Sequence, residues 1–263
     1  MLLEALIHQP VHRLIVASSM SVYGEGLYRH GNAICEPRPR SYEQLSGGRW
    51  ELERAGERLE PLATPETKHT VPTSVYALSK YDQEQLCLMF GAAYRIPTIA
   101  LRFFNVYGPN QSLSNPYTGV LAIFASRYLN GNPPLIFEDG AQRRDFVSVW
   151  DVAAACRLAL TTQAVGEVFN VGSGESRTVS EVAANMGDAL GVGIEPIVTG
   201  KYRIGDIRHC FADITKARRE LGFAPSVAFR DGLVELAQWL SATSAIDNYG
   251  HAVAELDRRG LTL

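Results

Sequence analysis

The alternation of short apolar runs with a long helical segment most constrains the fold of this chain. Leu14–Ala17 is an apolar run typical of a buried parallel strand. Ser74 is a good cap for a strong helix that we expect to reach Tyr94, and Thr98–Leu101 is a second apolar run. A strand, a crossover helix and a further strand imply a parallel βαβ unit. The sequence therefore predicts an α/β fold.

The same alternation continues to about residue 240. We expect helices at 1–7, 119–129, 152–160, 179–190, 215–221 and 230–240, a tail helix at 252–259, and strands at 135–137, 146–149, 168–171, 194–198 and 210–212. Residues 24–73 lack clear periodicity, apart from a possible short helix at Tyr42–Leu45. A connection of about 50 residues is usually a functional insertion or a lid.

Composition excludes several classes of protein. The chain has 25 Lys and Arg against 28 Asp and Glu among 263 residues, with no basic block, so a nucleic-acid partner is disfavoured. Its longest apolar run, at 119–125, is far shorter than the roughly 20 residues of a membrane span. The four cysteines show no C-x-x-C spacing, which favours a reduced, cytoplasmic compartment, and we expect no metal site.

Tyr76 and Lys80 are the first residues that suggest chemistry. Their spacing puts a phenol and an ammonium on one face of the predicted helix. The first predicted strand ends in Ser18 and Ser19, so hydroxyl groups lie at the carboxyl edge of the sheet, where α/β proteins bind ligands. A phenol titrates near pH 10, and a nearby cation favours its ionised form. The alternative is that Tyr76 and Lys80 are ordinary surface residues of a helix.

Six segments, in order, resemble the extended short-chain dehydrogenase/reductases. They are Ser18–Gly24, Tyr76-x-x-x-Lys80, Arg102–Pro109, Arg144–Ala153, Phe169–Gly174 and Gly205–Ala217. Within that group the chain is similar to the nucleotide-sugar epimerases, and Leu113–Gly119 looks most like the dTDP-L-rhamnose 4-epimerases. The resemblance implies part of a Rossmann doubly wound parallel sheet, lacking the first strands, with a smaller α/β C-terminal substrate-binding subdomain.

The resemblance also implies a role for individual residues. The catalytic set would be Ser19, Tyr76 and Lys80. The residues near NAD would be Ser18, Tyr76, Lys80, Phe103 and Phe104. The nucleotide-diphosphate sugar would contact Ser19, Asn105, Phe137, Arg144 and Arg203. The alternative for the two arginines is ion pairing at the surface, for instance with Asp145 or Asp206.

The domain organisation follows from the same resemblance. Residues 1–118 would form the C-terminal part of the NAD-binding domain, with the insertion at 24–73. Residues 119–240 would be mainly the substrate-binding subdomain, with some return to the Rossmann core, and 241–263 a helical tail. A full-length form would be a homodimer that associates through the helix at 74–94.

One family motif is absent from the sequence. A Gly-rich turn of the form G-x-x-G-x-x-G, which cradles the NAD pyrophosphate at a helix N-terminus, does not occur. The cluster Gly172–Gly174 matches a later strand end of the family, and we interpret it as a turn. We therefore expect weak NAD binding. Two explanations for the absent motif stay open: a misassigned start of the sequence, or a genuine fragment of a longer protein.

The expected reaction is C4 epimerisation of a dTDP- or UDP-hexose through a transient 4-keto sugar. Related dehydratases carry Asp and Glu where this chain has Met20 and Ser21, and related decarboxylases carry Glu at the second position. Neither Met nor Ser transfers the proton that these reactions need. Two alternatives stay open: a non-catalytic or partner-dependent fragment that binds nucleotide sugar but not NAD, and a 4-keto-sugar reductase.

Overall fold

A three-stranded parallel sheet is the centre of the molecule. The computed structural model describes residues 2–9, 11–111, 119–203 and 205–242. The sheet has the order β1-β7-β12, with bounds Leu14–Ser19, Thr98–Phe103 and Glu167–Val171. In the register, Phe103 pairs with Ser19 on one side and with Val171 on the other. The three strands thus end level with one another, at one carboxyl edge.

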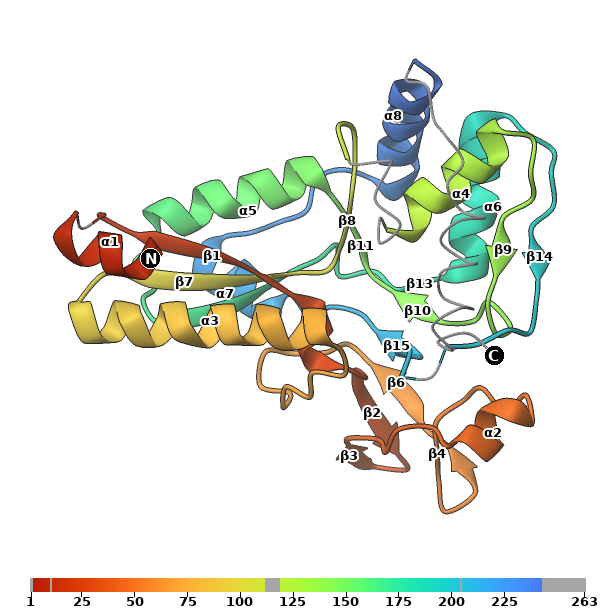
Figure 1. The fold of residues 1–263 in the computed structure, drawn as a ribbon, viewed down its shortest axis with the longest axis horizontal. Helices are drawn as coiled ribbons and strands as arrows, with labels where there is room; N and C mark the ends of the chain where they lie inside the picture. The colour runs from red at the N-terminus through yellow and green to blue at the C-terminus, as the bar shows by residue number, and fades with distance from the viewer. Residues whose placement is uncertain (1, 10, 112–118, 204, 243–263) are drawn as a thin grey trace.

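Helices cover both faces of this sheet, and α3 and α5 lie on opposite sides of it (Figure 1). One face packs against α1 and α3 and the other against α5 and α7, with bounds Leu2–His8, Val75–Tyr94, Val149–Thr161 and Thr215–Leu221. Alternation along β7 explains the division, because Ala100 points to the first face whereas Ile99 and Leu101 point to the second. The predicted α/β architecture is confirmed.

Helix α3 begins and ends as its sequence predicts. The Ser74 hydroxyl caps it by accepting a hydrogen bond from the Ala77 amide, and Arg95 ends it in the left-handed conformation. Its apolar residues Leu86 and Met89 are nevertheless 54% and 60% exposed. The buried residues of α3 are instead three small ones and one charged one, namely Ala77, Cys87, Gly91 and Glu84.

A second layer lies beyond the carboxyl edge of the sheet (Figure 1). Helices α4, α6 and α8 pack around their own apolar core, with bounds Val120–Leu129, Val179–Leu190 and Phe229–Ser241. Short strands outside the central sheet pair as β8 with β11, β9 with β14, and β10 with β13 and β15; their bounds are β8 (Asn105–Tyr107), β9 (Leu135–Ile136), β10 (Arg143–Arg144), β11 (Phe146–Ser148), β13 (Arg177–Thr178), β14 (Ile197–Val198) and β15 (His209–Cys210). The chain returns to the central sheet between these helices, in α5, β12 and α7.

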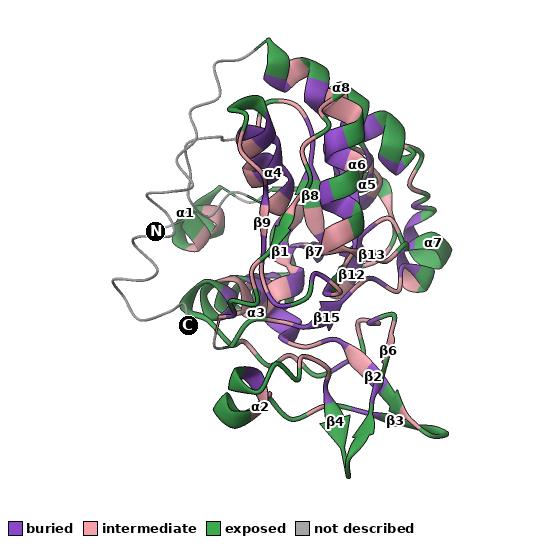
Figure 2. Cartoon of the chain, turned by 90° about the vertical axis from the view of Figure 1, so that its right-hand side faces the viewer, coloured by how far each residue is buried: buried purple, intermediate pink, exposed green. Residues whose placement is uncertain are grey.

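The insertion is more ordered than its sequence predicts. It contains a three-stranded sheet, a short helix and a hairpin, namely β2 (Leu27–His30), β3 (Ala33–Cys35), α2 (Tyr42–Ser46), β4 (Glu53–Arg54), β5 (Glu57–Arg58) and β6 (Glu60–Leu62). A small core of Tyr28, Cys35, Leu52 and Leu59 supports it, while the residues of β4 are exposed (Figure 2). Strands of two to four residues are too short to show periodicity, so the sequence predicted only the helix.

Two sequence predictions lie outside the described residues: the Leu113–Gly119 segment, apart from its last residue, and the tail helix. Along the described ranges no helix is both long and apolar enough to cross a membrane. The four cysteines form no disulfides.

Candidate active site

The carboxyl end of β1 continues into a short 3-10 helix, η1 (Met20–Tyr23), capped by Ser19. The Ser19 hydroxyl oxygen accepts hydrogen bonds from the Ser21 amide at 3.2 Å and from the Ser21 hydroxyl at 2.9 Å. Its own proton remains available to a ligand. The cap therefore fixes a hydroxyl donor at the edge of the sheet.

Tyr76 and Lys80 lie in the first turns of α3, which packs against β1 and η1. The Lys80 ammonium donates to the Ala17 carbonyl at 3.0 Å and to Gln83 Oε1 at 3.2 Å. Ala17 is two residues before Ser19, so this bond ties the start of α3 to the end of β1. Tyr76 is 58% exposed.

A buried ion pair beneath these residues joins α3 to β7, and Ser18 of β1 hydrogen-bonds to it. Glu84 Oε2 accepts hydrogen bonds from the Ser18 hydroxyl at 2.6 Å and from Arg102 Nε at 2.9 Å, and Arg102 Nη2 donates to Glu84 Oε1 at 2.6 Å. Both charged side chains are buried, at 0% and 6% exposure. Sequence reasoning missed this pair, although Glu84 follows Lys80 at the same step of four residues by which Lys80 follows Tyr76. The Ser18 hydroxyl thus points inward.

The ion pair extends to a buried tyrosine. The Arg102 guanidinium lies 4.7 Å from the centre of the Tyr23 ring, and the Tyr23 hydroxyl donates to Asn170 Oδ1 at 2.7 Å. Burial raises the pKa of Tyr23, which makes it a poor base near neutral pH. Phe104 is buried in the same apolar cluster, whereas Phe103 is partly buried at the end of β7.

The predicted substrate residues include two buried polar atoms that lack a partner among the described residues. These atoms are Asn105 Oδ1, at the start of β8, and Arg203 Nε. The Arg203 guanidinium lies over the Phe137 ring, 5.2 Å from its centre. Unsatisfied buried groups are rare in folded proteins, and both atoms are of the type that binds a polar ligand.

Arg144 is held differently. Its guanidinium donates to the backbone carbonyls of Arg143, Ile207 and Arg208, and it lies 3.9 Å from Asp206. The loose contact with Asp206 is the surface pairing that the sequence left open. Asp145 takes no part in it.

Asp145 is bound by the Gly-rich segment that follows β12. Its carboxylate accepts hydrogen bonds from the Ser173 amide at 2.6 Å, the Ser173 hydroxyl at 2.8 Å and the Gly174 amide at 2.9 Å. Burial raises the pKa of Asp145 to about 6, against the effect of these hydrogen bonds. Gly172 passes so close that an added Cβ would lie 2.7 Å from the carboxylate. The amides therefore bind an internal carboxylate, which fits a turn and leaves them unavailable to a cofactor phosphate.

A cavity of about 100 Å³ lies between the insertion and the 205–207 segment, and none of the predicted catalytic or substrate residues lines it. Its wall includes Tyr23 from the end of η1, Thr73 just before α3, Asp206 close after Arg203, and Arg40 and Lys68 from the insertion. The structure has no cluster of potential metal ligands within the described ranges.

The residues present fit one end of NAD. The Lys80 ammonium has three N–H donors and uses two of them on Ala17 and Gln83, so one remains for a ribose hydroxyl beside exposed Tyr76. For the pyrophosphate end, the Gly-rich turn that follows β12 offers no free amides, because those of Ser173 and Gly174 already bind Asp145.

Comparisons with known proteins agree with this geometry. The model of the NAD dependent epimerase/dehydratase family matches residues 54–172. The dTDP-L-rhamnose 4-epimerase of Burkholderia thailandensis is 35% identical over 234 residues, which cover 88% of this chain and 63% of that protein. The chain thus spans less than two thirds of this relative.

Solved structures give the same result. The UDP-glucose 4-epimerase of Thermotoga maritima, solved with UDP-glucose, superimposes with a TM-score of 0.73 at 32% identity, covering 92% of this chain and 67% of that one. The UDP-glucose 4-epimerase of Thermus thermophilus, solved with NAD, has a TM-score of 0.69 at 30% identity, covering 93% and 68%. Sequence motifs, fold and relatives lead to one conclusion: the chain belongs to the NAD dependent epimerase/dehydratase family.

Proposed function

We propose that this chain carries the catalytic and substrate-binding residues of an NAD-dependent nucleotide-sugar 4-epimerase. The observation that carries the proposal is the bond from the Lys80 ammonium to the Ala17 carbonyl, which ties the Tyr76–Lys80 turn to the strand that ends in Ser19. A phenol, an ammonium and a hydroxyl then share one edge of the sheet. That set suits proton transfer at a sugar hydroxyl.

Each residue has a distinct part in this reaction. Ser19 donates a hydrogen bond to the 4-hydroxyl oxygen and orients it. Tyr76 removes the proton of that hydroxyl and later returns it, and Lys80 stabilises the phenolate by its charge. NAD, when bound, would accept the C4 hydride and return it to the opposite face of the sugar.

The diphosphate and base of the substrate would lie in the second layer. Arg203 Nε is an unsatisfied donor that can bind a phosphate oxygen, the unsatisfied Asn105 Oδ1 can accept from a substrate hydroxyl, and the Phe137 ring offers an apolar surface for a base. A guanidinium matches the geometry of a phosphate. Arg144 would join them by exchanging its carbonyl partners for phosphate oxygens.

Epimerisation is favoured over related reactions by the residues after Ser19. Met20 is buried and the Ser21 hydroxyl donates to Ser19, so neither side chain provides the acid and base that water elimination requires. The substrate we propose is a dTDP- or UDP-hexose, in line with the names of the relatives.

A second candidate is nucleotide-sugar binding without NAD. The observation that favours it is that the amides of Ser173 and Gly174, in the Gly-rich turn after β12, bind Asp145 and are not free for a cofactor phosphate. Titration with NAD separates the two candidates, because micromolar affinity of the chain for NAD excludes the second.

We also propose a homodimer in the cytoplasm. Val75, Leu78, Leu86 and Met89 form one stripe along α3 and are between 51% and 86% exposed. A contiguous exposed apolar surface of this kind usually marks an interface with a partner. Free cysteines fit a reducing compartment.

The test is the substitution Tyr76→Phe, assayed with NAD and UDP-galactose, UDP-glucose or dTDP-L-rhamnose, with both C4 epimers followed by NMR. We expect the rate to fall by roughly 10²–10⁴-fold while uridine or thymidine diphosphate still binds. Tyr94→Phe is the matched control, since Tyr94 lies at the other end of α3 and is 51% exposed.

Three results would contradict the proposal. Near-normal turnover by Tyr76→Phe would remove Tyr76 from the mechanism. Stoichiometric consumption of reduced cofactor on a 4-keto sugar would indicate a reductase. A 4-keto-6-deoxy product would indicate a dehydratase.

A further inference from the structure

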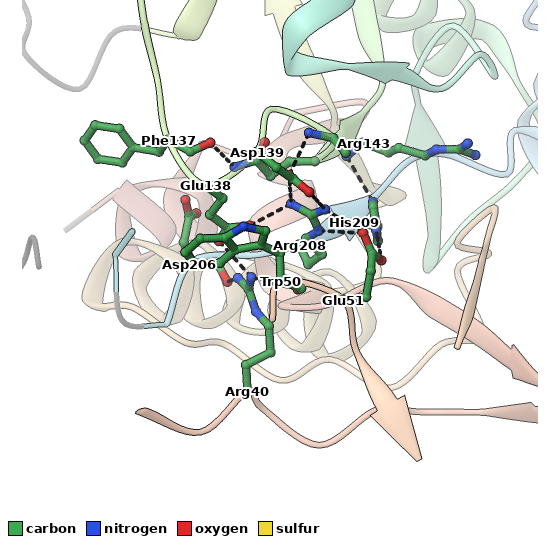
Figure 3. A network of polar contacts seen from close by, with 12 residues as sticks. Arg40, Trp50, Glu51, Phe137, Glu138, Asp139, Arg143, Asp206, Arg208 and His209 are labelled. Carbon is green, nitrogen blue, oxygen red and sulfur yellow. Dashed lines mark hydrogen bonds and ion pairs between the residues drawn. The ribbon is translucent and has the colours of Figure 1, made fainter. Parts of the chain in front are cut away.

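Arg208 is a completely buried charge between the insertion and the second layer. Its guanidinium donates to Glu138 at 2.8 Å, to Asp139 at 2.7 and 3.0 Å, and to Glu51 of the insertion at 2.5 and 3.2 Å. Figure 3 shows the guanidinium in the middle of these carboxylates. One arginine thus binds three carboxylates, which is more than charge balance alone requires. Because these carboxylates come from the insertion and from the segment after β9, the cluster joins parts of the chain that are far apart in the sequence.

The insertion contributes a second arginine to the same cluster. Arg40 donates to Glu138 Oε1 at 2.7 Å, and its other donors reach the carbonyls of Asp206 at 2.9 Å and Trp50 at 3.1 Å (Figure 3). Arg40 and Glu138 are 3% and 1% exposed. The insertion therefore contacts both the segment after β9 and the segment before β15.

These two segments carry Phe137 and Arg203, the pair to which we assign the base and diphosphate of the substrate. Glu138, next to Phe137, has a φ of +54°, which is uncommon for a residue other than glycine. Its amide donates to the Lys201 carbonyl at 2.7 Å. The Trp50 ring also packs against the Tyr202 ring, with centres 5.8 Å apart. The strained turn at Glu138 is thus held by side chains from the insertion.

We propose that Arg208, Glu51 and Arg40 are positioning residues, through which the insertion holds Phe137 and Arg203 in the geometry that binds a nucleoside diphosphate. This proposal rests on the proposed function, because it takes the Phe137–Arg203 pair as the nucleotide site. The insertion then acts on substrate affinity and leaves the proton-transfer residues Tyr76 and Lys80 unaffected.

The proposal has a reciprocal consequence. If the insertion stabilises the nucleotide site, a bound nucleotide must stabilise the insertion by the same free energy. Amide hydrogens in residues 40–54 should therefore exchange more slowly when uridine or thymidine diphosphate is bound. A cluster that only stabilises the fold would not respond to the nucleotide.

The experiment compares Glu51→Gln and Arg40→Met with the wild-type chain. In both variants Arg208 keeps Glu138 and Asp139, so the buried charge remains paired and we expect folding, checked by thermal unfolding. Calorimetric titration with uridine or thymidine diphosphate should show affinity weakened about tenfold or more, and KM raised with kcat unchanged. Glu60→Gln is the control, because Glu60 lies in the insertion in an exposed pair with Arg29, and its affinity should stay within about twofold.

The results distinguish two kinds of failure. Nucleotide affinity within twofold of wild type in both variants, or unchanged exchange of residues 40–54 in the wild type on nucleotide binding, would overturn this proposal alone. A wild-type chain that binds neither nucleotide would overturn the proposed function, and this proposal with it. Slower exchange together with weakened variants would establish the positioning role.

Discussion

The buried ion pair between Glu84 and Arg102 makes a sharp prediction about stability. Glu84→Gln removes the charge that compensates Arg102, while the shape of the side chain is kept. Breaking a buried pair in this way typically costs about 3–5 kcal/mol, because a charge remains buried without a counter-charge. Domains are stable by only about 5–15 kcal/mol, so the loss is a large fraction of the total. At roughly 2–4 °C per kcal/mol, the melting temperature should fall by about 6–20 °C.

Urea unfolding followed by circular dichroism measures this loss as a lower midpoint at unchanged slope. The double variant Glu84→Leu with Arg102→Met should recover at least half of it, because apolar residues often replace a buried pair without loss. Glu60→Gln, in the exposed pair with Arg29, should cost at most about 1 kcal/mol. A loss for Glu84→Gln as small as that control, or a double variant no more stable than Glu84→Gln, would refute the reasoning.

Three further predictions concern acid stability, packing and assembly. Burial acts to raise the pKa of Glu51, but the hydrogen bonds with His209 and Arg208 lower it by more, so that the pKa falls from 4.5 to about 2. Its stabilising effect is present above pH 4.5 and lost as the pH falls towards 2, so wild type should lose roughly 3 kcal/mol more than Glu51→Gln over that range in urea titrations. Gly91→Ala should destabilise α3 although alanine is the better helix former, since its Cβ would lie 2.0 Å from Thr98 Oγ1, whereas Gly193→Ala meets nothing within 4 Å and should be neutral by the same assay. Met89→Glu should weaken the proposed dimer in sedimentation experiments, and an unchanged association constant would place the interface elsewhere.

The sequence predicts those parts of the fold that depend on local patterns. Ser74 predicts the start of α3, and the apolar runs predict β1 and β7, because a capping residue or a buried strand can be recognised from a few consecutive residues. The Tyr76–Lys80 pair is visible for the same reason.

Long-range polar contacts could not be predicted in this way. Whether Glu84 is solvated or buried depends on Arg102, which lies in another element. The residues next to Glu84 in the sequence do not predict that contact. Arg208 meets Glu51 across 157 residues of sequence, so the cluster depends on how the insertion folds back. The exposed face of α3 illustrates the same limit, since Leu86 and Met89 look like core residues in a helical pattern.

The hydrogen bonds that hold the Asp145 carboxylate have a consequence for the neighbouring residue, Arg144. Bonds from Ser173 and Gly174 fix the backbone next to Arg144 on one side, and β10 pairs with β13 and β15 on the other. For Arg144 to contact a diphosphate, only its side chain has to rotate away from the carbonyls of the 207–208 segment. The side chain is already ordered by these hydrogen bonds, so the main cost is their loss, which bonds to phosphate oxygens would replace. The backbone that carries Arg144 is thus fixed before any ligand binds, and we expect affinity gained through Arg144 to appear mainly as slower dissociation.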